Sequence, residues 1–194
     1  MADSRATMPR ASSGRASGAS GSGRRAVFDT SQGAIVIELL PEAAPQTTSN
    51  FEKLVSWGFY DGLVWHRIVP GFVIQTGDPN TRGAVDSTRP TWGLGSAPGS
   101  VPLETDPNYR NDAGYVGLAH PSSSTSGSCQ FYINLANNNP LDGGYTVFGK
   151  VVRGMNVVEA IAALPVYGDG GSFGQQPVDA VSALILSATI QGRP

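Results

Sequence analysis

Cysteine, histidine and charged residues are all scarce in this sequence of 194 residues. Its single cysteine, Cys129, has no partner for a disulfide within the chain. No run of about 18 apolar residues occurs, so we expect no membrane-spanning segment. With 40% hydrophobic and 14% charged residues, the chain can bury one sizeable core, and we expect one folded domain.

Positive and negative charges are separated along the chain. Residues 1–25 contain five arginines and one acid, Asp3, whereas residues 26–194 contain the other eight of 13 Lys and Arg residues and the other fourteen of 15 Asp and Glu residues. The first segment therefore carries a net charge of +4 and the remainder −6. Because its mixture of Arg, Ser, Gly and Ala offers little to pack, we predict that residues 1–25 are disordered and that residues 26–194 form the domain.

The arginine-rich segment has several possible roles at this point. We interpret it as a solvated leader without a function of its own; the alternatives are a basic arm for nucleic acid, an organelle transit peptide and a remnant of cloning. It lacks the apolar core of a secretory signal peptide, so a cytoplasmic location is the default expectation. We do not expect nucleic-acid binding, because the acidic remainder of the chain repels phosphate.

Apolar residues at every second position predict a mainly β protein. Residues 26–41 are typical of a β-hairpin around the sequence TSQG, and further strands are predicted at 63–68, 72–76, 101–103, 115–119, 130–135, 145–151 and 177–190. Helical spacing predicts helices over 45–58 and 154–164. We expect a closed eight-stranded antiparallel barrel with two capping helices, because closure removes exposed edges. The Pro- and Gly-rich segment 80–113 is expected to be a long functional loop.

The stretch WHRIVPGFVIQTGD, residues 65–78, places two polar side chains among residues that favour burial. Strand alternation predicts that Trp65 and Arg67 share one face, with His66 and Ile68 on the other. The face with Arg67, if it forms the outer wall of the barrel, would carry a half-apolar groove that contains two fixed polar groups. The groove would be formed by Arg67, Phe72, Val73 and Gln75.

Three blocks of the sequence resemble the cyclophilin family, in the order found there. FYDGLVWHRIVPGFVIQTGD is similar to the signature of that family, and QFYINL and LDGGYTVFGKVVRGMNVVEAI are similar to its later blocks. The resemblance covers residues 27–190, and three ordered blocks are far more specific than one short motif. It implies an eight-stranded barrel with two capping helices and the activity of a peptidyl-prolyl cis-trans isomerase, which assists protein folding.

The resemblance implies roles for ten residues, and nothing in the sequence suggests a cofactor or metal. Arg67 falls on the catalytic arginine, which would donate to the prolyl nitrogen in the twisted transition state. Nine further residues fall on positions that bind substrate: Phe72, Val73, Gln75, Ala119, His120, Gln130, Tyr132, Leu141 and Tyr145. Four of these differ from the residues that many members carry, because Val73 replaces Met, His120 replaces Asn, Tyr132 replaces Phe and Tyr145 replaces His.

Two departures from the family pattern bear on ligands. Pro140 stands where many members carry a Trp that helps to bind cyclosporin, so we expect this drug to bind weakly. The loop SSSTSGSC, residues 122–129, is slightly longer than usual. The partners that we expect are proline-containing peptides and folding proteins, and we expect the chain to be a monomer.

Three other interpretations of the sequence compete with the isomerase. Cys129 with His66 and His120 could form a thiol-based catalytic set or a zinc site, but their spacing matches no metal pattern. The serines beside His120 could suggest a hydrolase, but the pattern G-x-S-x-G is absent. A cyclophilin-like module that binds Pro-containing segments without turnover is the main rival, and the presence of Arg67, Phe72 and Gln75 favours the enzyme.

Overall fold

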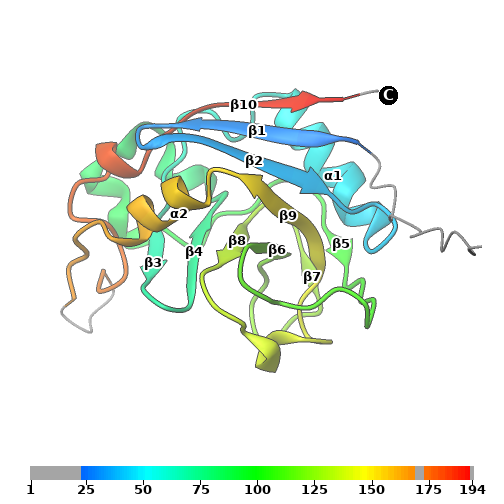
Figure 1. Ribbon diagram of the computed structural model, residues 1–194. Helices are drawn as coiled ribbons and strands as arrows, with labels where there is room; N and C mark the ends of the chain where they lie inside the picture. Colours follow the sequence, from blue (N-terminus) through cyan, green and yellow to red (C-terminus); the bar gives the residue numbers. More distant parts are fainter. Residues whose placement is uncertain (1–22, 169–172, 193–194) are drawn as a thin grey trace, which may run out of the picture.

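The computed structural model describes residues 23–168 and 173–192. Its main sheet has eight antiparallel strands in the order β10-β1-β2-β9-β6-β8-β4-β3 (Figure 1). Their bounds are β1 Arg25–Thr30, β2 Gly33–Leu39, β3 Arg67–Val69, β4 Val73–Thr76, β6 Tyr115–Leu118, β8 Phe131–Asn134, β9 Val147–Arg153 and β10 Ile185–Gln191. A separate two-stranded sheet pairs β5, Val101–Pro102, with β7, Ser126–Gly127.

The mainly β class and the curled eight-stranded sheet are confirmed, whereas closure of the barrel is not. β3 and β10 stand at the two ends of the strand order. Within the described residues, these ends are linked by an isolated bridge between Val64 and Leu184 instead of a ladder. The backbone bonds around this bridge include Ile185 N to Leu63 O, 2.8 Å, so the sheet ends approach each other just before β3 and β10 begin.

The sequence predicts two helices, over 45–58 and 154–164, and both form; they lie on different sides of the curled sheet (Figure 1). α1, Pro45–Ser56, packs against β9 and β10, while α2, Met155–Ala162, packs against β2, β3 and β4. Proline suits the first turn of α1 because the amide hydrogen that it lacks would have no partner within the helix there. None of the helices in the described part of the chain is both long and apolar enough to cross a membrane.

The core is an aromatic cluster inside the curled sheet. The ring centroids of Phe51 and Phe131 lie 5.3 Å apart in an edge-to-face arrangement, and Phe148 lies 4.9 Å from Phe51. Phe28 and Tyr60 complete the cluster from β1 and from the turn after α1. All five rings are buried, and such pairs stabilise a core beyond the contribution of buried area alone.

The prediction that Trp65 shares a face with Arg67 is wrong. The Trp65 side chain is fully buried, and its ring meets that of Phe131 edge-to-face at 5.7 Å. β3 begins only at Arg67, so the two-residue alternation does not extend back through the irregular backbone at Val64 and Trp65. Arg67 is half-buried on the other side of the sheet, and His66 is buried.

Several predicted boundaries also change. The strand expected at 177–190 starts at 185, and residues 181–183 form the short 3₁₀ helix η4, Val181–Ala183. The strand expected at 101–103 joins the separate two-stranded sheet. The long segment carries two further 3₁₀ helices, η1 Pro79–Ala84 and η2 Asp86–Thr91.

The prediction of disorder over 1–25 falls largely on residues 1–22, which lie outside the described residues. Two of the five arginines in that segment are described. Arg25 already belongs to β1, where it pairs with Gln191 and Glu38, and Arg24 forms an ion pair with Glu52 of α1. The folded part therefore includes residues just before the expected boundary at 26.

Candidate functional site

A cavity of about 760 Å³ lies on the outer side of β3, β4 and β8. It is lined by all ten of the site residues expected from the sequence: Arg67, Phe72, Val73, Gln75, Ala119, His120, Gln130, Tyr132, Leu141 and Tyr145. The rest of the wall comes from the segments 93–100 and 121–128. The volume is within the range of cavities that bind small ligands.

Strand register places the polar side chains in one row. Arg67 of β3 pairs with Gln75 of β4, and Gln75 pairs with Tyr132 of β8. Because neighbouring residues of a strand point to opposite faces, the residues next to Arg67, Gln75 and Tyr132 along their strands point into the core. These inward residues are Ile68, Ile74, Phe131 and Ile133.

A chain of side-chain hydrogen bonds runs along this row. Arg67 Nη1 donates to Gln75 Oε1 at 3.3 Å, and Gln75 Nε2 donates to Gln130 Oε1 at 2.9 Å. Gln130 Nε2 then donates to the backbone oxygens of Gly93 and Gly95, at 3.0 and 2.8 Å. The chain fixes both carboxamides and holds the 93–95 turn of the long loop at one end of the cavity.

The buried carboxylate of Asp78 holds the same turn from behind. It accepts hydrogen bonds from the backbone N–H groups of Gly93, Gly95 and Asn80, the last two at 3.2 and 2.7 Å. A Cβ atom at Gly95 would lie 2.1 Å from Asp78 Oδ1, so a side chain cannot be accommodated there without displacing the carboxylate. Glycine at position 95 thus allows the long loop to reach the cavity.

Arg67 combines partial burial with free donor capacity. Its guanidinium carbon lies 5.8 Å from the centre of the Phe72 ring, and burial lowers the pKa of Arg67 from its usual value. An arginine nevertheless stays protonated at any working pH. Its Nε and Nη1 donate to Gln175 and Gln75, so of its five N–H groups some remain for a ligand.

The apolar end of the cavity is built around Tyr132. A Cβ atom at Gly117 would lie 2.3 Å from the Tyr132 ring, so glycine leaves the space in which this ring lies against β6. The Tyr132 hydroxyl donates to Asn111 Oδ1 at 2.7 Å, and burial raises the pKa of Tyr132. The ring is therefore fixed and uncharged, with Val73 and Leu141 lining the same cavity.

The opposite rim is formed by two stacked aromatic rings. The rings of His120 and Tyr145 lie 4.4 Å apart and are nearly parallel, at 15°. The two ring nitrogens of His120 lie 2.9 Å from the backbone oxygens of Pro121 and Gly144. Ala119 N donates to Gln130 O at 2.9 Å, so the backbone at 119–121 is held on both sides.

The geometry does not favour the thiol or serine alternatives. Cys129 is buried, and burial raises the pKa of its thiol, which keeps it protonated and weakly nucleophilic. Burial lowers the pKa of His66 to about 4. The ring nitrogens of His120 face carbonyl oxygens and not a serine hydroxyl. Across residues 23–168 and 173–192, no group of three His, Cys, Asp or Glu side chains is placed to hold a metal ion.

Sequence reasoning missed three contributors to this site. Gln175 contacts Arg67 from a segment 108 positions away, and Asn111 fixes the hydroxyl of Tyr132. The segment 93–100 is expected from the sequence only as part of a functional loop, although its glycine-rich start, GLGS at 93–96, is a usable signal for close backbone approach. Nothing in the pattern around Gln175 distinguishes it from an ordinary surface glutamine.

Comparison with known proteins yields matches over most of the chain. The family model described as cyclophilin type peptidyl-prolyl cis-trans isomerase/CLD matches residues 25–184. A peptidyl-prolyl cis-trans isomerase of Acinetobacter baylyi is 38% identical over 165 residues, which cover 81% of this chain and 83% of that protein. Peptidyl-prolyl cis-trans isomerase B of Bacillus subtilis is 45% identical over 122 residues, which cover 62% of this chain and 78% of the relative.

A solved structure also resembles the fold. It is a cyclophilin type peptidyl-prolyl cis-trans isomerase of Cryptosporidium parvum, crystallised in the presence of the dipeptide Ala-Pro. The TM-score is 0.73 at 25% sequence identity, and the match covers 87% of this chain and 99% of that one.

Proposed function

The chain belongs to the cyclophilin-type peptidyl-prolyl cis-trans isomerases and is an enzyme of that activity, and on this premise we propose that Arg67 is its catalytic donor. The activity of the family favours an enzyme over a module that binds Pro-containing segments without turnover. What the proposal adds is the assignment of roles to the residues that line the cavity. The contacts of Arg67 in the row of polar side chains support it.

The reaction is slow because the peptide bond is partly double. Delocalisation of the nitrogen lone pair into the carbonyl gives a rotation barrier of roughly 18 to 20 kcal/mol. As the bond twists, the prolyl nitrogen becomes pyramidal and its lone pair localises, which creates a hydrogen-bond acceptor that hardly exists in the planar state. A donor aimed at this nitrogen stabilises the twisted state selectively.

Arg67 meets the requirements for such a donor. It is held at two points, by Gln75 and Gln175, so little reorganisation is needed when the lone pair appears. Its partial burial beside Phe72 reduces competition from water. A preorganised donor of this kind contributes about 10²- to 10³-fold in rate, and no proton has to move.

The apolar end of the cavity suits the pyrrolidine ring of proline. Phe72, Val73, Tyr132 and Leu141 line it and would grip the ring while the preceding carbonyl rotates. Burying about three CH₂ groups at ~0.8 kcal/mol each gives a few kcal/mol. Short peptides should therefore bind in the millimolar to high micromolar range, which permits turnover on many chains.

Proline-containing peptides are the substrate class. The Cryptosporidium parvum protein was crystallised with Ala-Pro, and the backbone of Ala119 and His120 would hold the residue before the proline in the present chain. Cyclosporin is expected to bind weakly, because Pro140 lies on the 3₁₀ helix η3, Asn139–Leu141, where a tryptophan would otherwise offer an indole N–H and apolar surface.

The test is a relaxation assay with an Ala-Pro peptide. Uncatalysed exchange takes about 10 to 100 s, so catalysis by the wild-type protein is readily visible. We expect Arg67→Ala to lose at least about tenfold in kcat/KM while its circular dichroism spectrum and melting temperature stay close to those of the wild type. Wild-type activity in this variant would show that Arg67 is not the donor.

A further inference from the structure

The segment that follows α2 covers the free edge of β3. Residues 165–168 and 173–178 pair with each other through an isolated bridge between Val166 and Pro177 and a bond from Val178 N to Pro165 O, 2.8 Å. We call residues 173–178 the docked segment. Ile68 N of β3 donates to Gln175 O of this segment at 2.7 Å. The backbone of Gln175 is thereby tied to the strand that carries Arg67.

The side chain of Gln175 meets the catalytic guanidinium. Gln175 Oε1 accepts from Arg67 Nε at 2.6 Å, whereas Gln75 Oε1 accepts from Nη1 at 3.3 Å. One contact would let the planar guanidinium pivot, but two contacts at different nitrogens fix its orientation. The shorter of the two comes from the docked segment.

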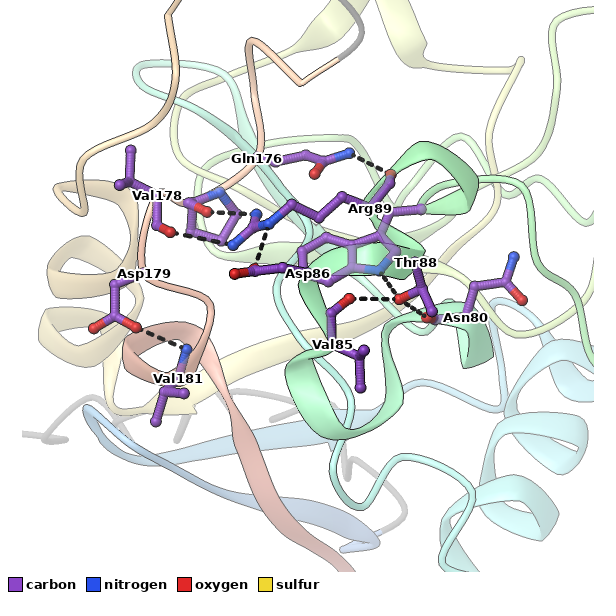
Figure 2. Close-up of polar contacts among 11 residues, drawn as sticks. Asn80, Val85, Asp86, Thr88, Arg89, Gln176, Val178, Asp179 and Val181 are labelled. Carbon is purple, nitrogen blue, oxygen red and sulfur yellow. Dashed lines mark hydrogen bonds and ion pairs between the residues drawn. The ribbon is translucent and has the colours of Figure 1, made fainter.

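A buried arginine holds the docked segment in place. Figure 2 shows Arg89 of η2 reaching from the long loop to this segment. Arg89 Nη1 donates to Pro177 O at 2.8 Å, and Nη2 donates to Val178 O at 3.1 Å. In the opposite direction, Gln176 Nε2 donates to Arg89 O at 3.1 Å (Figure 2). The two loops are therefore joined by reciprocal bonds.

The surroundings of Arg89 leave its side chain little choice of position. Only 7% of the side chain is exposed, and its Nε donates to Asp86 Oδ1 at 2.7 Å. Its guanidinium carbon lies 4.6 Å from the Trp92 ring and 5.3 Å from the Tyr167 ring. A buried cation is tolerated when acceptors and aromatic faces surround it, and displacing it would leave these carbonyl oxygens without their donor.

We propose that Gln175 is a positioning residue for Arg67 and that Arg89 is the anchor that places Gln175. The proposal rests on the catalytic role proposed for Arg67. Arg89 stands outside the cavity and belongs to the loop that continues to Gly93 and Gly95, which accept from Gln130. The same buried cation therefore links both loops that reach the row of polar side chains.

The first experiment replaces the acceptor on Gln175. Gln175→Leu keeps a similar volume and removes the oxygen, and we expect kcat for the Ala-Pro peptide to fall about 3- to 10-fold with KM within about twofold. Gln175→Glu keeps an acceptor for Arg67 Nε and should recover most of the lost rate. Gln46→Leu changes an exposed glutamine of α1 and serves as the matched control, with kcat unchanged.

The second readout does not depend on activity. In ¹⁵N–¹H spectra, the Nε–Hε signal of Arg67 should shift and exchange faster with water in Gln175→Leu and stay in place in Gln46→Leu. Arg89→Lys keeps the positive charge but cannot reach three acceptors at once, so it should move the same signal and lower kcat. That variant is measured at a temperature where circular dichroism shows it folded.

The outcomes separate the two proposals. An unchanged Arg67 signal and unchanged kcat in Gln175→Leu overturn the positioning role. A response to Gln175→Leu combined with no response to Arg89→Lys overturns the anchor. If Arg67→Ala itself retains full activity, the catalytic proposal fails, and the Arg67 signal still reports whether Gln175 and Arg89 hold the side chain.

Discussion

The inner and outer faces of β4 and β8 hold their side chains in different ways. Inward, Ile74, Phe131 and Ile133 are fully buried among apolar neighbours of the core. Outward, Gln75 and Tyr132 are held by hydrogen bonds that lead away from the sheet, to Gln130 and Asn111. One backbone therefore supports a core that is defined by volume and a site that is defined by directed polar contacts.

This difference suggests that the two faces fail differently when they are changed. Removing atoms from the inner face leaves a cavity, which costs stability wherever it occurs. Removing a donor or acceptor from the outer face changes orientation, because the contacts there are directional. The predictions below test this separation.

The largest expected effect concerns the inner face. Phe131→Ala removes a ring that contacts Phe28, Phe51 and Trp65, and we expect a loss of about 3 to 5 kcal/mol in the free energy of unfolding. Urea denaturation measures it. In buffer without urea, and at a temperature where the variant is folded, its kcat/KM should stay within about threefold of the wild-type value. A tenfold loss under those conditions would mean that the faces are not separable.

His66 is buried just before β3 and makes stability depend on pH. Burial lowers its pKa to about 4, with Asp78 raising it and Arg67 lowering it. In the unfolded chain His66 binds a proton near pH 6.5, whereas in the folded chain it does so only near pH 4. The free energy of unfolding should therefore fall by about 3 kcal/mol as pH decreases from 6.5 to 4, and it should level off below pH 4. Urea titrations at several pH values measure the free energy of unfolding of the wild type and of His66→Phe. The variant should lack the part of the pH dependence that His66 causes. Parallel pH profiles for the two proteins would contradict the assignment.

Cyclosporin affinity tests a single position on the rim of the outer face. Pro140 is exposed on η3 next to Leu141, so Pro140→Trp should add an indole donor and apolar surface without disturbing the core. We expect the variant to bind cyclosporin at least about tenfold more tightly than the wild type, which is ~1.4 kcal/mol, by calorimetric titration. Turnover of the Ala-Pro peptide is the control and should change little. Nanomolar affinity in the wild type would refute the prediction.

The smallest effect is expected at the hydroxyl of Tyr132. Tyr132→Phe removes the hydroxyl that donates to the buried Asn111 Oδ1 at 2.7 Å. This oxygen keeps only the longer contact with Asn134 Nδ2, at 3.4 Å. We expect a loss of about 1 kcal/mol in the free energy of unfolding and a relaxation rate within about threefold of the wild type, because the ring that grips proline remains. A rate loss as large as that of Arg67→Ala would mean that the hydroxyl takes part in the reaction.

Much of the outer face was predictable because it lies on strands. Arg67 and Gln75 are directed by a two-residue period and by pairing across one bend. The other six expected site residues that line the cavity beside Arg67, Phe72, Val73 and Gln75 are expected only from the resemblance to the cyclophilin family. The error at Trp65 arose where that period stops, since β3 is only three residues long. Side chains alternate between two faces only where the backbone is extended, so the two-residue period does not predict the direction of Trp65.

The supports of the site could not be predicted for a related reason. Gln175 lies on a loop and Arg89 on the short 3₁₀ helix η2 within the long loop, and their contacts join residues 108 and 88 positions apart. Loop conformation depends on which carbonyl groups and rings meet in the folded chain, and no periodic pattern records this. The alternating apolar residues at 177–190 predict one long strand, whereas residues 177–178 belong to the docked segment, 181–183 form η4 and the strand begins at 185.

The most direct test of the central claim is the division of the Arg67→Ala effect between kcat and KM. A bond to the prolyl nitrogen that forms only in the twisted state should appear in kcat, so kcat should fall at least about tenfold while KM for the Ala-Pro peptide changes less than about twofold. Saturation kinetics of cis-trans exchange, followed by NMR line shapes, give both quantities. A rise in KM with kcat unchanged would contradict the account, because Arg67 would then bind the planar substrate and not the transition state.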